Sequence, residues 1–357
     1  MFANRGLYGF AKCLTLLVLG SLALTPAMAR EKYEVAWSIY VGWMPWPYAE
    51  ESGILKKWAD KYDIEIELVQ MDYVASIEAY VAGQVDACVM TNMECLNMPA
   101  ASGIDSTALI IGDYSNGNDA ILVRDNIDAK SIKGREISLV ELTVSHYLLN
   151  RYLEKQGMSE RDVRILNTSD SDIGPIFLAD KSQKVVVTWN PIVMQIEQHP
   201  GISKLFTSAD IPGEIIDMMV VNTKTLSENP ALGKALTGAW YEVMQVMSQR
   251  GAAANKALAQ MAGRAECSPI EFKNQLKTTA MFYTPKAAID YAGGEEIKRN
   301  MDYVRDFCFQ QGLLGEDAPS ADVVGIRFPD GSVRGDKGNV KFRFDTTYLK
   351  MAAAGKL

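Results

Sequence analysis

The stretch SIYVGWMPWPYAEESGILKKWADKY, residues 38–62, begins with the alternation of a β-strand and ends with the spacing of a helix. Between them, Trp43, Pro45, Trp46, Pro47 and Tyr48 fall within six residues. Loops usually run over the surface and favour Gly, Asn, Asp and Ser, and large exposed aromatic side chains there are costly. We therefore expect this loop either to be buried or to contact a ligand.

The same order of strand and then helix recurs along the chain. The first series is YEVAWSI (strand), SGILKKWADKY (helix), IEIELVQM (strand), VASIEAYVAG (helix) and VDACVMTN (buried strand). After residue 117 a second series follows, with strands DAILVRD, REISLVE, VRILNTS and KVVVTWN and helices in TVSHYLLNRYLEKQG and IGPIFLAD. A strand in IIDMMVVNTKTL comes next, and the chain after Asn229 has mainly helical spacing to about Gly312.

Strands that alternate with helices indicate an α/β fold whose sheets are mostly parallel and are covered by helices on both faces. Two such series predict two lobes, with the chain crossing between them twice. We expect residues 30–116 and 217–357 to form the first lobe, with a helical C-terminal region, and residues 117–216 to form the second.

The first 29 residues have the features of a secretory signal peptide. Arg5 and Lys12 provide positive charge, LTLLVLGSLALT (14–25) is an apolar run too short to span a bilayer, and Ala27-Met28-Ala29 fits a cleavage site. The alternative is a retained membrane anchor, which the short apolar run disfavours. We predict a mature chain that starts near Arg30 and is periplasmic.

Composition argues against several classes of function. The net charge is −8 and the Lys and Arg residues are scattered, so no nucleic-acid footprint is expected. Two histidines rule out a His-rich metal site, and motifs for a nucleophile elbow, a phosphate loop or a dinucleotide site are missing from the sequence. We therefore expect no catalytic residues, no metal and no cofactor. A disulfide between Cys267 and Cys308 is a further possibility.

Ligands of open parallel sheets bind at the carboxyl ends of the strands. The loops expected there are YVGWMPWPY (40–48), TNMECL (91–96), DYSNGND (113–119), ELTVSH (141–146) and WNP (189–191), and none contains Lys or Arg. The candidate ligand-binding residues are Trp43, Trp46, Asn92, Glu94, Asp113, Asp119, Glu141, Ser145, Trp189 and Asp217.

With these segments in place, the sequence resembles the periplasmic solute-binding proteins of ABC importers, in the nitrate, sulfonate and thiamine-precursor class. The resemblance covers roughly residues 33–225. The segments SIYVGWMP, MTNMECL, GDYSNGND and ELTVSHYLLNR are most similar to the branch associated with urea carboxylase, which is linked to urea and guanidine. The resemblance implies a two-lobed fold of the periplasmic-binding-protein type II, with permease and ATPase subunits as partners.

Aromatic side chains on both lobes are expected to close over a flat solute. In this interpretation Trp43 and Trp46 face Trp189, and each well-placed ring contributes about 0.5–2 kcal/mol to the binding of a cation. The alternative for Trp46 is that it packs under the following helix while Pro45 and Pro47 shape the turn.

Five carboxylates without basic neighbours would make the gap between the lobes anionic, so that it repels nitrate or a sulfonate and suits guanidinium or urea. They are Glu94, Asp113, Asp119, Glu141 and Asp217, of which we expect two or three to contact the solute. Asn92 and Ser145 either bind the solute or cap helices. A thiamine-precursor pyrimidine, a sulfonate-type solute and a secreted enzyme on the same fold remain as alternatives.

Overall fold

The computed structural model describes residues 30–125 and 127–357. The predicted signal peptide, residues 1–29, lies outside the described residues, and Glu31–Leu357 form one compact unit. The strands are β1 (Glu31–Trp37), β2 (Ile64–Gln70), β3 (Ala87–Thr91), β4 (Ser106–Tyr114), β5 (Ala120–Arg124), β6 (Glu136–Leu139), β7 (Arg164–Asn167), β8 (Val185–Thr188), β9 (Ile202–Thr207), β10 (Ile216–Asn222), β11 (Gly325–Arg327), β12 (Val333–Arg334) and β13 (Val340–Phe344).

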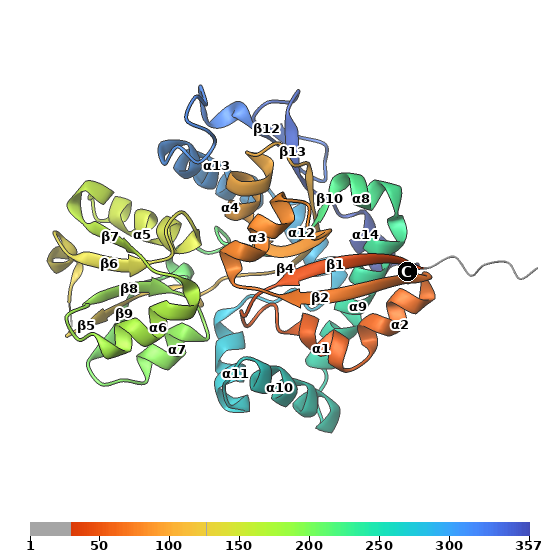
Figure 1. The fold of residues 1–357 in the computed structure, drawn as a ribbon, viewed down its shortest axis with the longest axis horizontal. Coiled ribbons are helices and arrows are strands. Elements are labelled where there is room, and N and C mark those ends of the chain that lie inside the picture. Colours follow the sequence, from red (N-terminus) through yellow and green to blue (C-terminus); the bar gives the residue numbers. More distant parts are fainter. Residues whose placement is uncertain (1–29, 126) are drawn as a thin grey trace, which may run out of the picture. The chain divides into compact units, whose positions relative to one another are not determined.

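The helices flank these strands in the order of the chain (Figure 1). They are α1 (Pro45–Glu51), α2 (Ile54–Lys61), α3 (Tyr73–Val81), α4 (Asn92–Cys95), α5 (Val144–Lys155), α6 (Asp170–Ala179), α7 (Ile192–Glu197), α8 (Thr223–Glu228), α9 (Pro230–Ser248), α10 (Ala252–Arg264), α11 (Pro269–Gln275), α12 (Pro285–Ala292), α13 (Glu295–Gln310) and α14 (Thr347–Ala353). Within the described part of the chain, no helix combines the length and apolar composition needed to cross a membrane.

Two sheets organise the unit. The first has the strand order β12-β11-β13-β4-β10-β3-β1-β2 and the second has the order β7-β6-β8-β5-β9. In Figure 1 the second sheet lies at the left with α5 to α7, and the first sheet lies with the remaining helices. The predicted α/β architecture with two helix-covered sheets is therefore confirmed.

The sheets are mixed, however, rather than mostly parallel. β10 runs antiparallel to both β3 and β4, and β5 runs antiparallel to both β8 and β9. The cause is the double crossing. The chain leaves the first sheet at the end of β4 and returns into β10 at the same edge, so the two strands must run in opposite directions. β5 and β9 are related in the same way in the second sheet.

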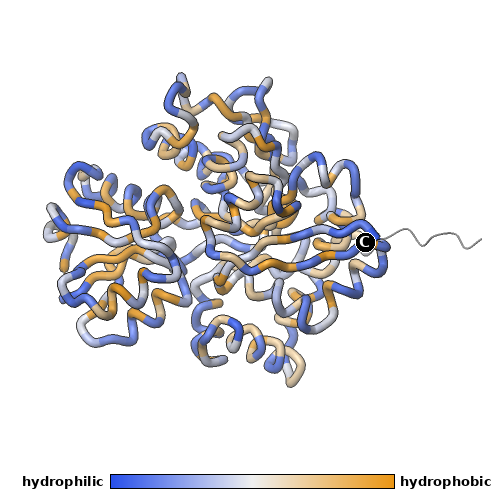
Figure 2. Tube along the Cα trace, in the orientation of Figure 1, coloured by the Kyte–Doolittle hydropathy of each residue, from blue (hydrophilic) through white to orange (hydrophobic). Residues whose placement is uncertain are grey.

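Helices cover both faces of the second sheet, as alternation along β5 shows. Ala120 and Leu122 pack with Phe177 on the side of α6 and α7, while Ile121 and Val123 belong to the core that includes α5. Figure 2 shows hydrophobic residues concentrated along the strands of both sheets. Their continuous burial is typical of sheets that are covered on both sides.

The sequence patterns missed several strands. β9 was not predicted, and the C-terminal region is not only helical, because β11, β12 and β13 extend the first sheet beside β4. These C-terminal strands have three, two and five residues. Segments this short show little periodicity, and their pairing partners are distant in sequence. Cys267 and Cys308 are free, so the possible disulfide between them does not form in this structure.

A close helix contact gives a test of the core. A Cβ atom at Gly238 in α9 would lie 2.4 Å from a ring carbon of Trp58, whereas one at Gly263 in α10 would meet nothing within 4 Å. We expect Gly238→Ala to lower the free energy of unfolding by about 1–3 kcal/mol through overpacking. Gly263→Ala is the matched control and should raise it by up to about 1 kcal/mol. Urea denaturation measures both, and equal effects would contradict the packing of α2 on α9.

Candidate ligand-binding site

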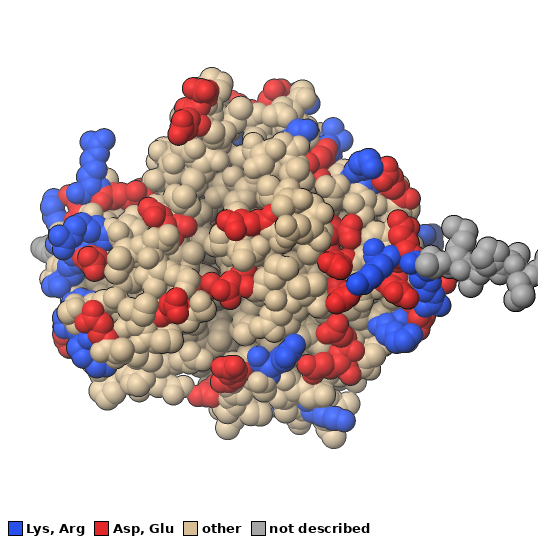
Figure 3. All heavy atoms as spheres, viewed as in Figure 1, with Lys and Arg blue, Asp and Glu red and all other residues tan. Residues whose placement is uncertain are grey.

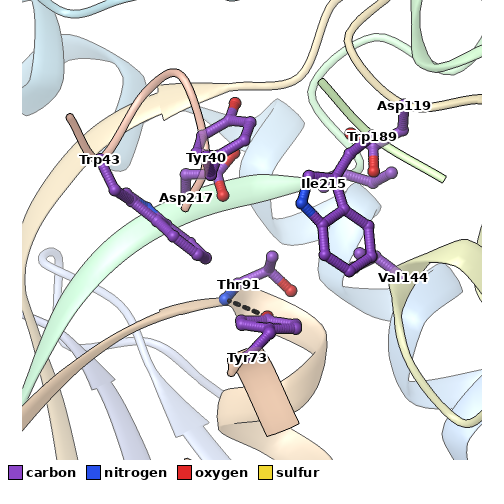
Figure 4. A pocket seen from close by; sticks show the side chains of 9 residues that line it. All are labelled: Tyr40, Trp43, Tyr73, Thr91, Asp119, Val144, Trp189, Ile215 and Asp217. Atoms are coloured by element: carbon purple, nitrogen blue, oxygen red, sulfur yellow. Dashed lines mark hydrogen bonds between the residues drawn. The ribbon is translucent and has the colours of Figure 1, made fainter. Parts of the chain in front are cut away.

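A cavity lies where the carboxyl ends of β1 and β3 meet the two crossing segments, residues 115–119 and 208–215. The space open to the centre of a water-sized molecule is about 20 Å³, and all non-atom space there, open solvent included, is about 280 Å³. The lining residues are Tyr40, Trp43, Tyr73, Thr91, Asp119, Val144, Trp189, Ile215 and Asp217 (Figure 4). They come from elements of both sheets, because the loop after β1 and the start of α3 meet α5 and the end of β8 at this point.

Four aromatic side chains line the cavity, and they are Tyr40, Trp43, Tyr73 and Trp189. Trp43 and Trp189 approach from opposite sides, and Tyr73 lies below and between them (Figure 4). The ring centroid of Tyr73 is 5.5 Å from that of Trp43 and 5.8 Å from that of Trp189. Sequence reasoning missed Tyr73, although it begins the helix that follows β2. Applying the rule of carboxyl ends to that strand would have found it.

Trp46 is not part of this wall. It lies on the first turn of α1, is 1 % exposed, and packs its ring 5.1 Å from that of Trp240 in α9. The helix begins at Pro45, which turns Trp46 towards α9. The structure therefore places Trp46 outside the cavity, in the position that the packing alternative describes.

Three of the five predicted carboxylates meet beside the cavity. Asp119 and Asp217 line it, and Asp113 lies behind Asp217 as its cross-strand neighbour. All three are buried. The Tyr40 hydroxyl donates to Asp113 Oδ1 at 2.8 Å, and the Ser115 hydroxyl donates to Asp119 Oδ2.

These carboxyl groups hold protons more strongly than usual. Burial raises the pKa of Asp119 to about 6 and that of Asp113 to about 7. The pKa of Asp217 lies well above its ordinary value, because of burial and then of repulsion from Asp113 and Asp119. The described residues that line the cavity include no Lys, Arg or His. A bound cation would supply the missing positive charge and favour the ionised carboxylates.

Two buried polar atoms in the lining have no hydrogen-bond partner among the described residues. They are Trp43 Nε1, which is a donor, and Asp217 Oδ2, which lacks a partner only while it and Asp113 are both ionised. A proton on either carboxyl group lets Asp113 and Asp217 hydrogen-bond to each other. Buried polar groups are nearly always paired, so Trp43 Nε1 is available to a bound molecule or to water. No group of three His, Cys, Asp or Glu residues in the described ranges could hold a metal ion.

Glu141 and Ser145 do not line the cavity. Glu141 is exposed in the turn before α5, and its backbone N–H donates to Asn167 Oδ1 at 3.0 Å. Because α5 begins only at Val144, that residue reaches the cavity in place of Glu141. The Ser145 hydroxyl is buried and has no partner among the described residues, but it too lies outside the lining.

Asn92 and Glu94 bond to protein groups instead of facing the cavity. Asn92 Oδ1 accepts from the backbone N–H of Ile216 at 2.9 Å, and its Nδ2 donates to the Glu214 carbonyl at 3.0 Å, so it secures the start of β10. Glu94 accepts from the backbone N–H of Val144 and from the Thr91 hydroxyl. The structure therefore places both outside the lining of the cavity and gives both protein partners.

The raised pKa values predict how the stability of the empty protein depends on pH. Asp113 and Asp119 stay protonated in the folded state up to about pH 7 and 6, whereas an unfolded Asp releases its proton near pH 3.9. The folded state thus binds more protons between about pH 4 and 7, and the free energy of unfolding falls as the pH rises through this window. We expect their contribution to be fully present below pH 4 and lost by about pH 8.

Asp217→Asn tests this expectation because it removes one charge from the buried group without changing its shape. In this variant the free energy of unfolding should fall less steeply as the pH rises, and at pH 8 it should exceed that of the wild type by about 1 kcal/mol or more. Glu141→Gln, at an exposed position, is the control and should follow the wild type. Chemical denaturation at a series of pH values measures all three, and parallel curves would contradict the buried charge cluster.

The comparisons with known proteins agree with this architecture. The family model described as NMT1/THI5 like matches residues 120–254. The alkanesulfonate-binding protein SsuA from Xanthomonas axonopodis pv. citri, bound to MOPS, has a TM-score of 0.64 at 16 % identity, covering 81 % of this chain and 96 % of its own. SsuA from Escherichia coli, an aliphatic sulphonate binding protein, has a TM-score of 0.65 at 16 % identity, with 82 % and 95 % covered.

The nitrate-binding protein NrtA from Synechocystis PCC 6803 has a TM-score of 0.54 at 13 % identity, covering 90 % of this chain and 98 % of its own. A search of curated protein sequences found no match. Identities this low establish the fold alone. The chain therefore has the two-lobed α/β fold of periplasmic binding proteins, and residues 120–254 are similar to the NMT1/THI5-like family.

Proposed function

We propose that this protein is the periplasmic solute-binding component of an ABC importer, and that it captures guanidinium or urea between its lobes for delivery to a membrane permease. The fold and the partial family match support the role of a binding protein. The observation that carries the choice of solute is a small cavity with aromatic walls and buried carboxyl groups, in which none of the described lining residues is basic.

Charge argues for a cation or a neutral donor over an anion. The structural neighbours are named for sulfonate and nitrate, but an anion in this cavity would lie beside Asp119 and Asp217 with no basic lining residue to offset its lost hydration. Guanidinium is flat, offers N–H groups in the plane to carboxylates, and offers its faces to aromatic rings. Urea supplies the same kind of N–H donor without the charge.

Size argues in the same direction. Pockets for drug-sized ligands usually have volumes of about 300–1,000 Å³, whereas the space open to the centre of a water-sized molecule in this cavity is only about 20 Å³. A solute with few non-hydrogen atoms fits better than a substituted pyrimidine.

Charged side chains at the surface agree with the preference for a cation or a neutral donor over an anion. On the face shown in Figure 3, Lys and Arg gather mainly towards the two ends, and the region between them carries mainly acidic and uncharged side chains.

Calorimetry with both solutes tests the proposal. Very small ligands gain at most about 1.5 kcal/mol per non-hydrogen atom, which limits a four-atom solute to roughly −6 kcal/mol and a dissociation constant of tens of micromolar. Charge-assisted hydrogen bonds are about twice as strong as neutral ones. We therefore expect guanidinium to bind at least about tenfold more tightly than urea, and to be recovered unchanged after incubation.

Three variants locate the solute within the protein. Asp217→Asn should weaken guanidinium more than urea, and Trp43→Ala should weaken guanidinium by at least about 1 kcal/mol. Glu141→Gln is the matched control, because its carboxylate is exposed and outside the cavity. Tighter binding of an alkanesulfonate, nitrate or a pyrimidine than of guanidinium would overturn the choice of solute, and chemical turnover would indicate an enzyme.

The affinity for guanidinium should also depend on pH. Below about pH 6 the buried carboxyl groups are protonated, so a cation has to displace a proton in order to bind. We expect the affinity to rise by up to tenfold per pH unit between about pH 5 and 7, with a smaller slope in Asp217→Asn. Urea should show little change. A flat profile for guanidinium would mean that the carboxyl groups do not titrate with binding.

A further inference from the structure

Two acidic side chains cross between the lobes, and each reaches the start of a helix on the other side. Glu94 of α4, next to the first sheet, accepts a hydrogen bond from the backbone N–H of Val144 at 2.8 Å. Asp170 of α6, next to the second sheet, accepts one from the backbone N–H of Tyr73 at 3.2 Å. Val144 and Tyr73 are the first residues of α5 and α3, so the arrangement is reciprocal.

Both N–H groups would otherwise lack a partner within their own helix. The first N–H groups of a helix have no intrahelical acceptor, and the positive end of the helix dipole favours a carboxylate there. The residue that precedes α3, Asp72, makes no side-chain capping bond. Thr143, which precedes α5, caps the N–H of Ser145 and leaves that of Val144 to Glu94. Each helix start is therefore completed by the opposite lobe.

Hydrogen bonds along the cavity wall connect the two bridges. The Thr91 hydroxyl donates to Glu94, and the Thr91 backbone N–H donates to the Tyr73 hydroxyl at 3.1 Å (Figure 4). Tyr73, Thr91 and Val144 all line the cavity. A continuous path thus runs from Asp170 through Tyr73, Thr91 and Glu94 to Val144, and it passes along the wall that a solute would touch.

We propose that Glu94 and Asp170 form a reciprocal latch that holds the two lobes together and sets how long a bound solute stays. They are positioning residues, because neither lines the cavity. Parting the lobes breaks both capping bonds at once and returns two helix starts to water. A solute packed on Tyr73 and Thr91 stabilises the hydrogen-bonded path between the two capping bonds. Solute binding therefore stabilises the latch, and the latch in turn stabilises the bound solute.

Other polar contacts between the lobes differ in kind. Asn97 Nδ2 donates to the Leu142 carbonyl, and Gln198 Nε2 donates to Glu271, both at exposed sites. At half-buried sites, Asn190 Nδ2 donates to Thr278 Oγ1 at 3.2 Å and Gln311 Nε2 donates to Glu160 Oε1 at 2.8 Å. None of these four contacts reaches the first residue of a helix at the cavity wall.

The ligand-free test measures amide hydrogen exchange by NMR at Tyr73 and Val144 in Asp170→Ala. We expect faster exchange at Tyr73, which loses its acceptor, and also at Val144, which loses only the support of the linked path. Asp170→Asn keeps an acceptor oxygen and should restore both. Asp172→Ala removes an exposed acid from the same turn, where its recorded partner is the Ser169 hydroxyl, and should match the wild type. Unchanged exchange at Val144 in Asp170→Ala would overturn the latch.

The kinetic test rests on the proposed function and uses guanidinium in stopped-flow measurements. Losing one capping bond should raise koff about fivefold and leave kon within about twofold, and Asp170→Asn should again restore the wild-type value. An unchanged koff in Asp170→Ala would show that the latch does not control residence time. Failure of the wild type to bind guanidinium or urea would instead count against the proposed solute, while the exchange measurement would still decide whether the latch exists.

Discussion

The double crossing of the chain between the two sheets is the constraint on which the site depends. Residues 115–119 lead from β4 to β5, and residues 208–215 lead from β9 back to β10. The crossings are bonded to each other, through the Ser115 N–H to the Ile215 carbonyl at 3.0 Å and the Ser208 N–H to the Asp119 carbonyl at 2.9 Å. This pairing brings Asp113, Asp119 and Asp217 together, although Asp217 is far from the other two in sequence.

Burial of this carboxyl cluster gives the empty site its electrostatic character. Burial raises the pKa values of these three acids, repulsion between them adds to the effect, and none of the described residues that line the cavity is a base, so protons neutralise them. Such a cluster costs stability in the empty protein at neutral pH. Functional sites are where costs of this kind are usually found, because a ligand of opposite charge can offset them.

Tyr73 links the two properties of the site. Its ring stands between Trp43 and Trp189 in the cavity wall, and its hydroxyl accepts from Thr91. Its backbone N–H, at the start of α3, donates to Asp170 from the other lobe. One residue therefore takes part in the surface that would contact a solute and in the contacts that join the lobes. A change at the cavity wall can therefore affect the contacts between the lobes, because Tyr73 is hydrogen-bonded to Thr91 through its hydroxyl and to Asp170 through its backbone N–H.

Local sequence determined the elements and part of the site. Periodicity placed most strands and the longer helices, and the rule of carboxyl ends selected Trp43, Asp119 and Trp189, which line the cavity together with Asp217, a candidate from the start of β10. These predictions depend only on which residues follow a strand, and hydrophobic alternation records that position within a few residues. The short strands β11 to β13 escaped because their pairing is set by contacts with distant residues.

Tertiary structure alone decided which of the polar and aromatic candidates meet. Glu141 and Asp119 look equivalent in sequence, yet the late start of α5 leaves Glu141 in water, whereas the paired crossings bury Asp119. Trp46 and Trp43 share one loop, but the first turn of α1 directs Trp46 towards α9. Glu94 caps a helix of the opposite lobe. The direction of a side chain depends on where its helix begins and on what packs against it, and those contacts come from residues far away in the chain.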